Sequence, residues 1–176
     1  MQEREDRVNQ EDQARRRYGV GELGRVVVMR LGPGDDILPS ILDIAREAGV
    51  QQGIILGGAA SLTQARLRNV RRYPDEFPIT DDVRIFSAFD GRLELLSLSG
   101  NISQTADGKA YIHCHAAISA GKPDAMAYGG HLLPETNVFS TAELSLVEVR
   151  GCDILRLDDP ETHVGELYFR PWAKDG

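Results

Sequence analysis

The chain has 176 residues, 41% of them hydrophobic and 27% charged, a size and mixture that suit one globular domain with a core of its own. Its formal net charge of −7 argues against a generic duplex-DNA binder and against binding to anionic membranes, because both of those surfaces attract a basic face. No window approaches the roughly 18 consecutive apolar residues that a membrane-spanning helix needs.

Residues 1–17 hold five arginines and five acidic residues and almost no large apolar ones. We expect them to form a disordered or frayed lead without a signal peptide or membrane anchor, since no apolar stripe is present to dock. Residues 18–176 contain no repeat and no second boundary, so we expect a single domain there. The two cysteines, Cys114 and Cys152, belong to no CxxC pair and predict reduced thiols in a cytoplasmic protein.

A β-branched run predicts the first strand at 25–31, and a Gly-Pro-Gly turn then leads into a helix that ends near Ala48. Asp35 or Asp36 is the expected cap of this helix. Further strands are predicted at 53–56, 62–70, 83–88, 93–100, 111–119, 137–149, 153–157 and 164–169.

Pairs of residues that contain glycine mark the expected breaks between these strands. Gly57-Gly58 is predicted to interrupt the second strand, and Asp90-Gly91 and Asp107-Gly108 are predicted hairpin turns. One helix and many turn-linked strands predict an α+β fold with a largely antiparallel, twisted sheet and one main flanking helix.

Three of the four histidines lie within 19 residues. His113 and His115 are two positions apart on a predicted strand, so their side chains leave the same face, while Cys114 between them points to the apolar face. Gly129-Gly130 lets a returning strand approach closely and bring His131 beside them. The fourth histidine, His163, lies in an acidic stretch and is expected at the surface.

Three imidazoles from two neighbouring strands suit zinc or another divalent transition metal. Three protein ligands leave a fourth position for water or substrate, as in catalytic rather than structural zinc sites. The alternative is two polar residues on a wet strand face and one loop histidine, and the spacing alone does not decide between these interpretations.

The order of motifs resembles a known family. RLGPGDD opens the match, LELLSLSGNIS follows, and DGKAYIHCHAAIS and GGHLLPETNVFSTAEL close it. Together they resemble the stand-alone prokaryotic form of the plants and prokaryotes conserved (PPC) domain over about residues 22–150.

The resemblance implies a seven- or eight-stranded antiparallel sheet with a flanking helix, assembled as a homotrimer. It also implies zinc held by His113, His115 and His131, and it matches Glu143 to a recurrent acid of the family. The chain departs from the pattern at Glu135, where the family usually has glycine. The Arg-Gly-Arg-Pro AT-hook through which plant members bind DNA does not occur in the sequence.

Further charged residues are candidates for the site. Glu143 is a candidate for three roles: a catalytic acid or base, an acceptor of a hydrogen bond from a histidine N–H, or a polar residue of a trimer interface. The same three roles are open for Glu94. Arg66 and Arg68 share a strand face, and we select Arg66 as the candidate clamp for a substrate carboxylate or phosphate. The simpler interpretation of these arginines is a solvated edge paired with nearby acids.

Three functions follow in order of preference. The first is a trimeric zinc-binding module, and the second is a zinc-dependent lyase or hydrolase that acts on a small carboxylate substrate. The third and most distant is a DNA-binding regulator, which the net charge disfavours. The partners expected are therefore further copies of the chain and a small-molecule ligand, with nucleic acid and membrane disfavoured.

Overall fold

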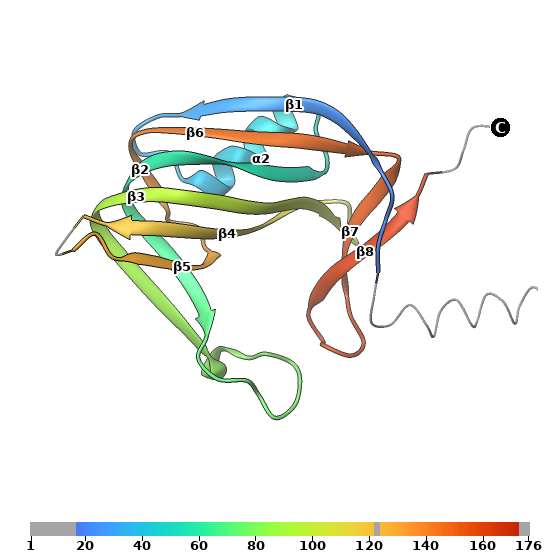
Figure 1. Ribbon diagram of the computed structural model, residues 1–176. Helices are drawn as coiled ribbons and strands as arrows, with labels where there is room; N and C mark the ends of the chain where they lie inside the picture. The colour runs from blue at the N-terminus through green and yellow to red at the C-terminus, as the bar shows by residue number, and fades with distance from the viewer. Residues whose placement is uncertain (1–16, 122–123, 173–176) are drawn as a thin grey trace, which may run out of the picture.

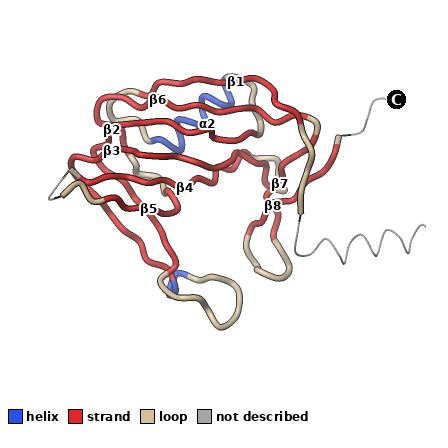
Figure 2. Tube along the Cα trace, viewed as in Figure 1, coloured by secondary structure: helices blue, strands red, loops and turns tan. Residues whose placement is uncertain are grey.

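The computed structural model describes residues 17–121 and 124–172, and most of the lead expected at 1–17 lies outside the described residues. The elements are β1 (Glu22–Leu31), α2 (Ile37–Glu47), β2 (Gly53–Val70), the 3-10 turn η2 (Asp81–Val83), β3 (Arg84–Thr105), β4 (Ala110–Ala120), β5 (Ala127–Leu132), β6 (Asn137–Arg150), β7 (Cys152–Asp158) and β8 (Gly165–Pro171). Figure 2 shows how strongly strands dominate this set. No helix among the described residues is long and apolar enough to cross a membrane.

The strands form one sheet in the order β1-β6-β2-β5-β4-β3-β7-β8. Its pairings are antiparallel apart from the parallel contact of β3 with β7, so the largely antiparallel sheet expected from the sequence is confirmed. A further pairing joins β2 directly to β3. Because β2 also pairs with β5, the strands β2, β5, β4 and β3 form a closed ring of pairings.

Two predicted interruptions are wrong. Gly57-Gly58 does not break a strand: β2 runs on through it, with a register shift beside Gly57, whose φ is 132°. Asp90-Gly91 is not a hairpin turn, because β3 also continues and the register against β2 slips there instead. Gly91 has a φ of 115°, which permits a β-bulge where a turn was expected. Both long strands therefore bend, whereas Asp107-Gly108 does turn the chain from β3 into β4.

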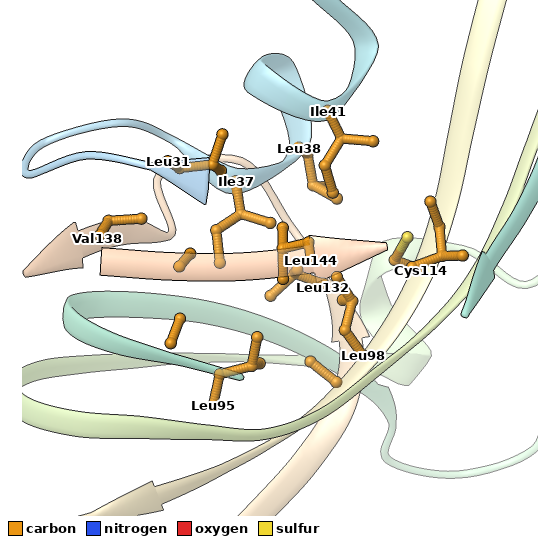
Figure 3. Packing of buried hydrophobic residues seen from close by; sticks show 14 of the residues in the cluster. Leu31, Ile37, Leu38, Ile41, Leu95, Leu98, Cys114, Leu132, Val138 and Leu144 are labelled. Carbon is orange, nitrogen blue, oxygen red and sulfur yellow. The ribbon is translucent and has the colours of Figure 1, made fainter. Parts of the chain in front are cut away.

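The core lies between the sheet and α2 (Figure 3). Ile37, Leu38, Ile41 and Ala45 recur at helical spacing and are buried against the sheet. Each large side chain buried in this way contributes roughly 1.5–3 kcal/mol. Asp36 precedes the helix, as expected, but its carboxylate accepts backbone N–H groups of the loop before β6 rather than capping the helix.

No helix of residues 17–121 or 124–172 packs on the opposite sheet face, and we call it the open face. Its apolar side chains include Val28 at 76% exposure and Leu56 at 59%. The bent ends of β2 and β3 extend away from this sheet as one arm, and the β7–β8 hairpin projects on the other side (Figure 1). Strand β4 crosses the region between them, and this arrangement positions the histidines.

Candidate metal centre

Two neighbouring strands bring the three histidines together. His115 on β4 lies directly opposite His131 on β5, and His113 is two residues along β4. The nitrogen atoms that could act as ligands all lie within 4.8 Å of one another, and the ring centroids are 4.7–5.5 Å apart. Cys114 is buried on the core side, so alternation along the strand separates it from the rings as expected.

The glycines before His131 allow this approach. A Cβ atom at Gly130 would lie 2.6 Å from the Asn69 side-chain amide, and the same amide donates a hydrogen bond to the Gly129 carbonyl. A side chain at position 130 would therefore displace the Asn69 amide and break the hydrogen bond with which it joins β2 to β5. The double glycine thus has a packing reason as well as the conformational one suggested by the sequence.

The rings of His113 and His131 are ready to accept an ion at neutral pH. Burial, first, and then the positive charge of Arg156 lower the pKa of His113 to about 4, and burial and Arg68 lower that of His131 to about 4. None of the three rings makes a hydrogen bond with another described residue. Neutral imidazoles without internal partners fit a metal better than they fit a satisfied structural cluster.

A cavity of about 630 Å³ adjoins the rings of His113 and His131. It lies between the arm and the β7–β8 hairpin, and its lining includes His113, His131, Arg68, Arg84 and Arg156. Its acidic lining residues are Asp107, Asp158 and Glu166.

The structure does not bring the other sequence candidates to this point. Arg66 donates to Asp90 at 2.9 Å and lies 3.7 Å from Glu135, which matches the simpler interpretation of a paired edge. Glu143 is exposed on β6, opposite Arg30 and Ala59, and does not line the cavity. Glu94 is exposed on β3, opposite Ser61 and Ser119.

The cavity arginines are the residues that the sequence analysis missed. The sequence showed Arg68 near Arg66, but the choice between them depends on which one pairs with His131 on β5. Nothing in the sequence pattern pointed to Arg156, because only the pairing of β7 with β3 places it beside His113.

Comparison with known proteins came from three directions. The sequence model of the Plants and Prokaryotes Conserved (PCC) domain matches residues 18–150. A curated protein named bifunctional protein GlmU, from Synechococcus sp. strain JA-2-3B'a(2-13), is 30% identical over 151 residues, which are 86% of this chain and 21% of GlmU. The chain therefore spans about a fifth of the length of the curated relatives it matches.

Solved structures share the fold. The metal-containing protein AF0104 of Archaeoglobus fulgidus has a TM-score of 0.70 at 24% identity, covering 86% of this chain and 99% of that one. A plant- and prokaryote-conserved (PPC) protein of Pyrococcus horikoshii has a TM-score of 0.68 at 25% identity, covering 90% of this chain and 98% of that one.

Proposed function

Because the chain belongs to the Plants and Prokaryotes Conserved (PCC) domain family, we propose that it is a homotrimeric metal-binding protein in which His113, His115 and His131 hold one divalent ion. The observation that carries this proposal is the convergence of three unpartnered imidazoles within 4.8 Å. Zinc suits three nitrogen ligands and an open position best. A bound ion of this kind supplies Lewis-acid chemistry at that position.

The protonation state of two of the histidines supports the proposal. Ligand histidines must be neutral, and burial together with neighbouring guanidinium groups keeps the pKa values of His113 and His131 near 4. The A. fulgidus protein is described as metal-containing, which motivates a metal measurement on this chain.

The open face supports the homotrimer. The open face exposes four apolar side chains on β1 and β2, the two strands that flank β6. They are Val26, Val28, Ile54 and Leu56, which expose between 44% and 76% of their surface. Contiguous apolar surface of this kind is typical of a face covered by another subunit. Glu143 lies on the same face, so of the three roles considered for it we favour a polar residue of the subunit interface.

Metal analysis of the purified protein tests the metal site. We expect about one equivalent per chain in the wild type and about a tenfold loss of affinity or more in His113→Ala and His131→Ala, because each removes one of three ligands. His163→Ala is the matched control, since His163 is exposed and lies outside the cluster. Equal metal content in all four proteins would contradict the proposal.

The cavity favours one second candidate, a zinc-dependent lyase or hydrolase acting on a small carboxylate substrate. A sealed cluster would exclude an enzyme, whereas His113 and His131 open onto about 630 Å³. A substrate screen with and without chelator tests this candidate. Turnover that survives complete metal removal would exclude the metal from the reaction.

A further inference from the structure

Two arginines beside the histidines have no carboxylate partner among the described residues. Arg68 is half-buried and takes part in none of the ion pairs or side-chain hydrogen bonds of the described ranges. Arg156 donates to the Gly165 carbonyl at 3.1 Å and to the Asn101 side chain at 3.4 Å, and its buried Nε has no partner. Half-buried guanidinium groups in proteins normally have a counterion.

The fully solvated arginines of the chain do not raise this question. Arg30, Arg71 and Arg92 also form no ion pair with a described residue, but all three are exposed to water. Arg84, the third arginine of the cavity, pairs with Asp81 at 2.8 Å. Arg68 and Arg156 are therefore distinguished by partial burial without neutralisation.

Both guanidinium groups flank the histidine cluster. Arg68 is the direct cross-strand partner of His131, which places their side chains on one face of the sheet. Arg156 is held by Asn101, and Asn101 is the cross-strand partner of His113. The positive charges of Arg156 and Arg68 both act on His113, so the two groups approach it together.

The acidic residues of the cavity do not balance these charges. Asp107 is paired with Lys109 at 2.6 Å, Asp158 is exposed, and Glu166 is a distant acceptor for the Thr162 hydroxyl at 3.4 Å. Glu166 attracts Arg156 but forms no ion pair with it. No acid contributes to the shifts at His113 and His131.

A divalent ion on three neutral imidazoles would add two positive charges to this uncompensated region. We infer that the cavity binds a small organic anion, with Arg68 and Arg156 receiving its carboxylate or phosphate group beside the metal. Planar guanidinium groups match either oxyanion through paired N–H donors. The cavity volume of about 630 Å³ leaves room for the rest of a small metabolite-sized molecule. This inference rests on the proposed metal function.

Titration of the zinc-loaded protein with inorganic phosphate and, separately, with malonate tests the inference by calorimetry. We expect saturable binding of at least one of the two anions, weakened about tenfold or more in Arg68→Gln and in Arg156→Gln. Arg92→Gln is the matched control, because Arg92 lies on β3 outside the cavity, and its affinity is expected to stay within about twofold of the wild type. Tighter binding of phosphate would identify a phosphate ester as the ligand class, and tighter binding of malonate a carboxylate.

Metal content is measured on the same samples, so that the two proposals fail separately. One equivalent of zinc with no saturable binding of either anion, or with equal affinity in Arg68→Gln, Arg156→Gln and the wild type, would overturn the anion site and leave the metal site standing. Absence of zinc in the wild type would overturn both. Arg68→Lys and Arg156→Lys keep the positive charge and serve as controls for misfolding. If zinc content is retained, each lysine variant is expected to bind the anion more tightly than the corresponding glutamine variant. Equally weak anion binding by the lysine and glutamine variants would count against a charge-based site.

Discussion

The single residue Glu135 shows how a departure from a family pattern acquires a physical meaning. The resemblance places glycine at this position, and the structure gives Glu135 a φ of 66°, in the left-handed region that side chains with a Cβ atom disfavour. Its N–H donates to the Asp36 carboxylate at 2.6 Å, which fixes the loop before β6 in this conformation. The backbone at Glu135 is therefore strained, and this residue lies close to the N-terminus of α2.

Glu135→Gly is expected to relieve this strain. Left-handed geometry costs a non-glycine residue about 1–2 kcal/mol, and the greater freedom of glycine in the unfolded chain takes back part of that gain. The exposed contact with Arg66 at 3.7 Å contributes little. We expect urea denaturation to give a free energy of unfolding about 0.5–1 kcal/mol higher than that of the wild type. Glu161→Gly, at an exposed position, is the control. A loss of stability would show that the side chain of Glu135 outweighs its backbone strain.

The histidines make the stability of the metal-free protein depend on pH. The pKa of His113 and of His131 is about 4 in the folded chain, against 6.5 for an unperturbed histidine side chain. Between these values the unfolded chain binds protons that the folded chain does not, so stability is fully present above pH 6.5 and is lost as the pH falls toward 4. Because both rings are half-exposed, we expect roughly 1 kcal/mol from each.

Urea denaturation in the presence of a chelator, at steps between about pH 7 and about pH 4.5, measures this effect. The double variant His113→Gln, His131→Gln is expected to show a flatter dependence across the window. Glu148 and Asp107 have pKa values lowered to about 2, chiefly by hydrogen bonds from Arg25 and Lys109, and their contributions are lost only at lower pH. An unchanged slope in the double variant would mean that the burial of the rings is not what depresses their pKa values.

At the scale of elements, the sequence predicts local pattern well and long-range pairing poorly. Alternation along β4 placed His113 and His115 on one face and Cys114 in the core, and the glycine pair correctly predicted the return of His131. Each of these inferences concerns neighbours in the chain or a short connection, where backbone geometry alone is decisive.

The errors occurred where tertiary context decides between two uses of the same residues. Asp90-Gly91 favours a tight turn in isolation, yet β2 offers a continuous partner on both sides of it and the chain forms a bulge. The same limit explains Arg66 and Arg68, which occupy equivalent positions in the sequence pattern. Only the neighbours Asp90 and His131, brought in by β3 and β5, distinguish a paired guanidinium group from an unpaired one.

The whole molecule presents two surfaces of different character. The cavity between the arm and the β7–β8 hairpin is rich in charge, while the open face carries a group of exposed apolar side chains on β1 and β2. An apolar face of this kind on a chain of 19.4 kDa is stabilised when other copies cover it. The homotrimer proposed for the chain uses this face, and Ile54 on it shares a cross-strand row with Asn101 and His113, so the proposed interface adjoins the histidine site.

Leu56→Glu is expected to separate the subunits without unfolding the chain. Leu56 is 59% exposed on β2, so the substitution leaves the core intact, but in a closed trimer it would bury three carboxylates against apolar surface. Each desolvated charge costs several kcal/mol, more than the roughly 1.5–3 kcal/mol gained from burying one leucine. Light scattering after size-exclusion chromatography should therefore give a mass near that of one chain, against about three times that value for the wild type.

Tyr73→Glu, at a residue that is 87% exposed in the loop of the arm, is the control and should remain trimeric. A trimeric Leu56→Glu protein would place the subunit interface elsewhere on the molecule.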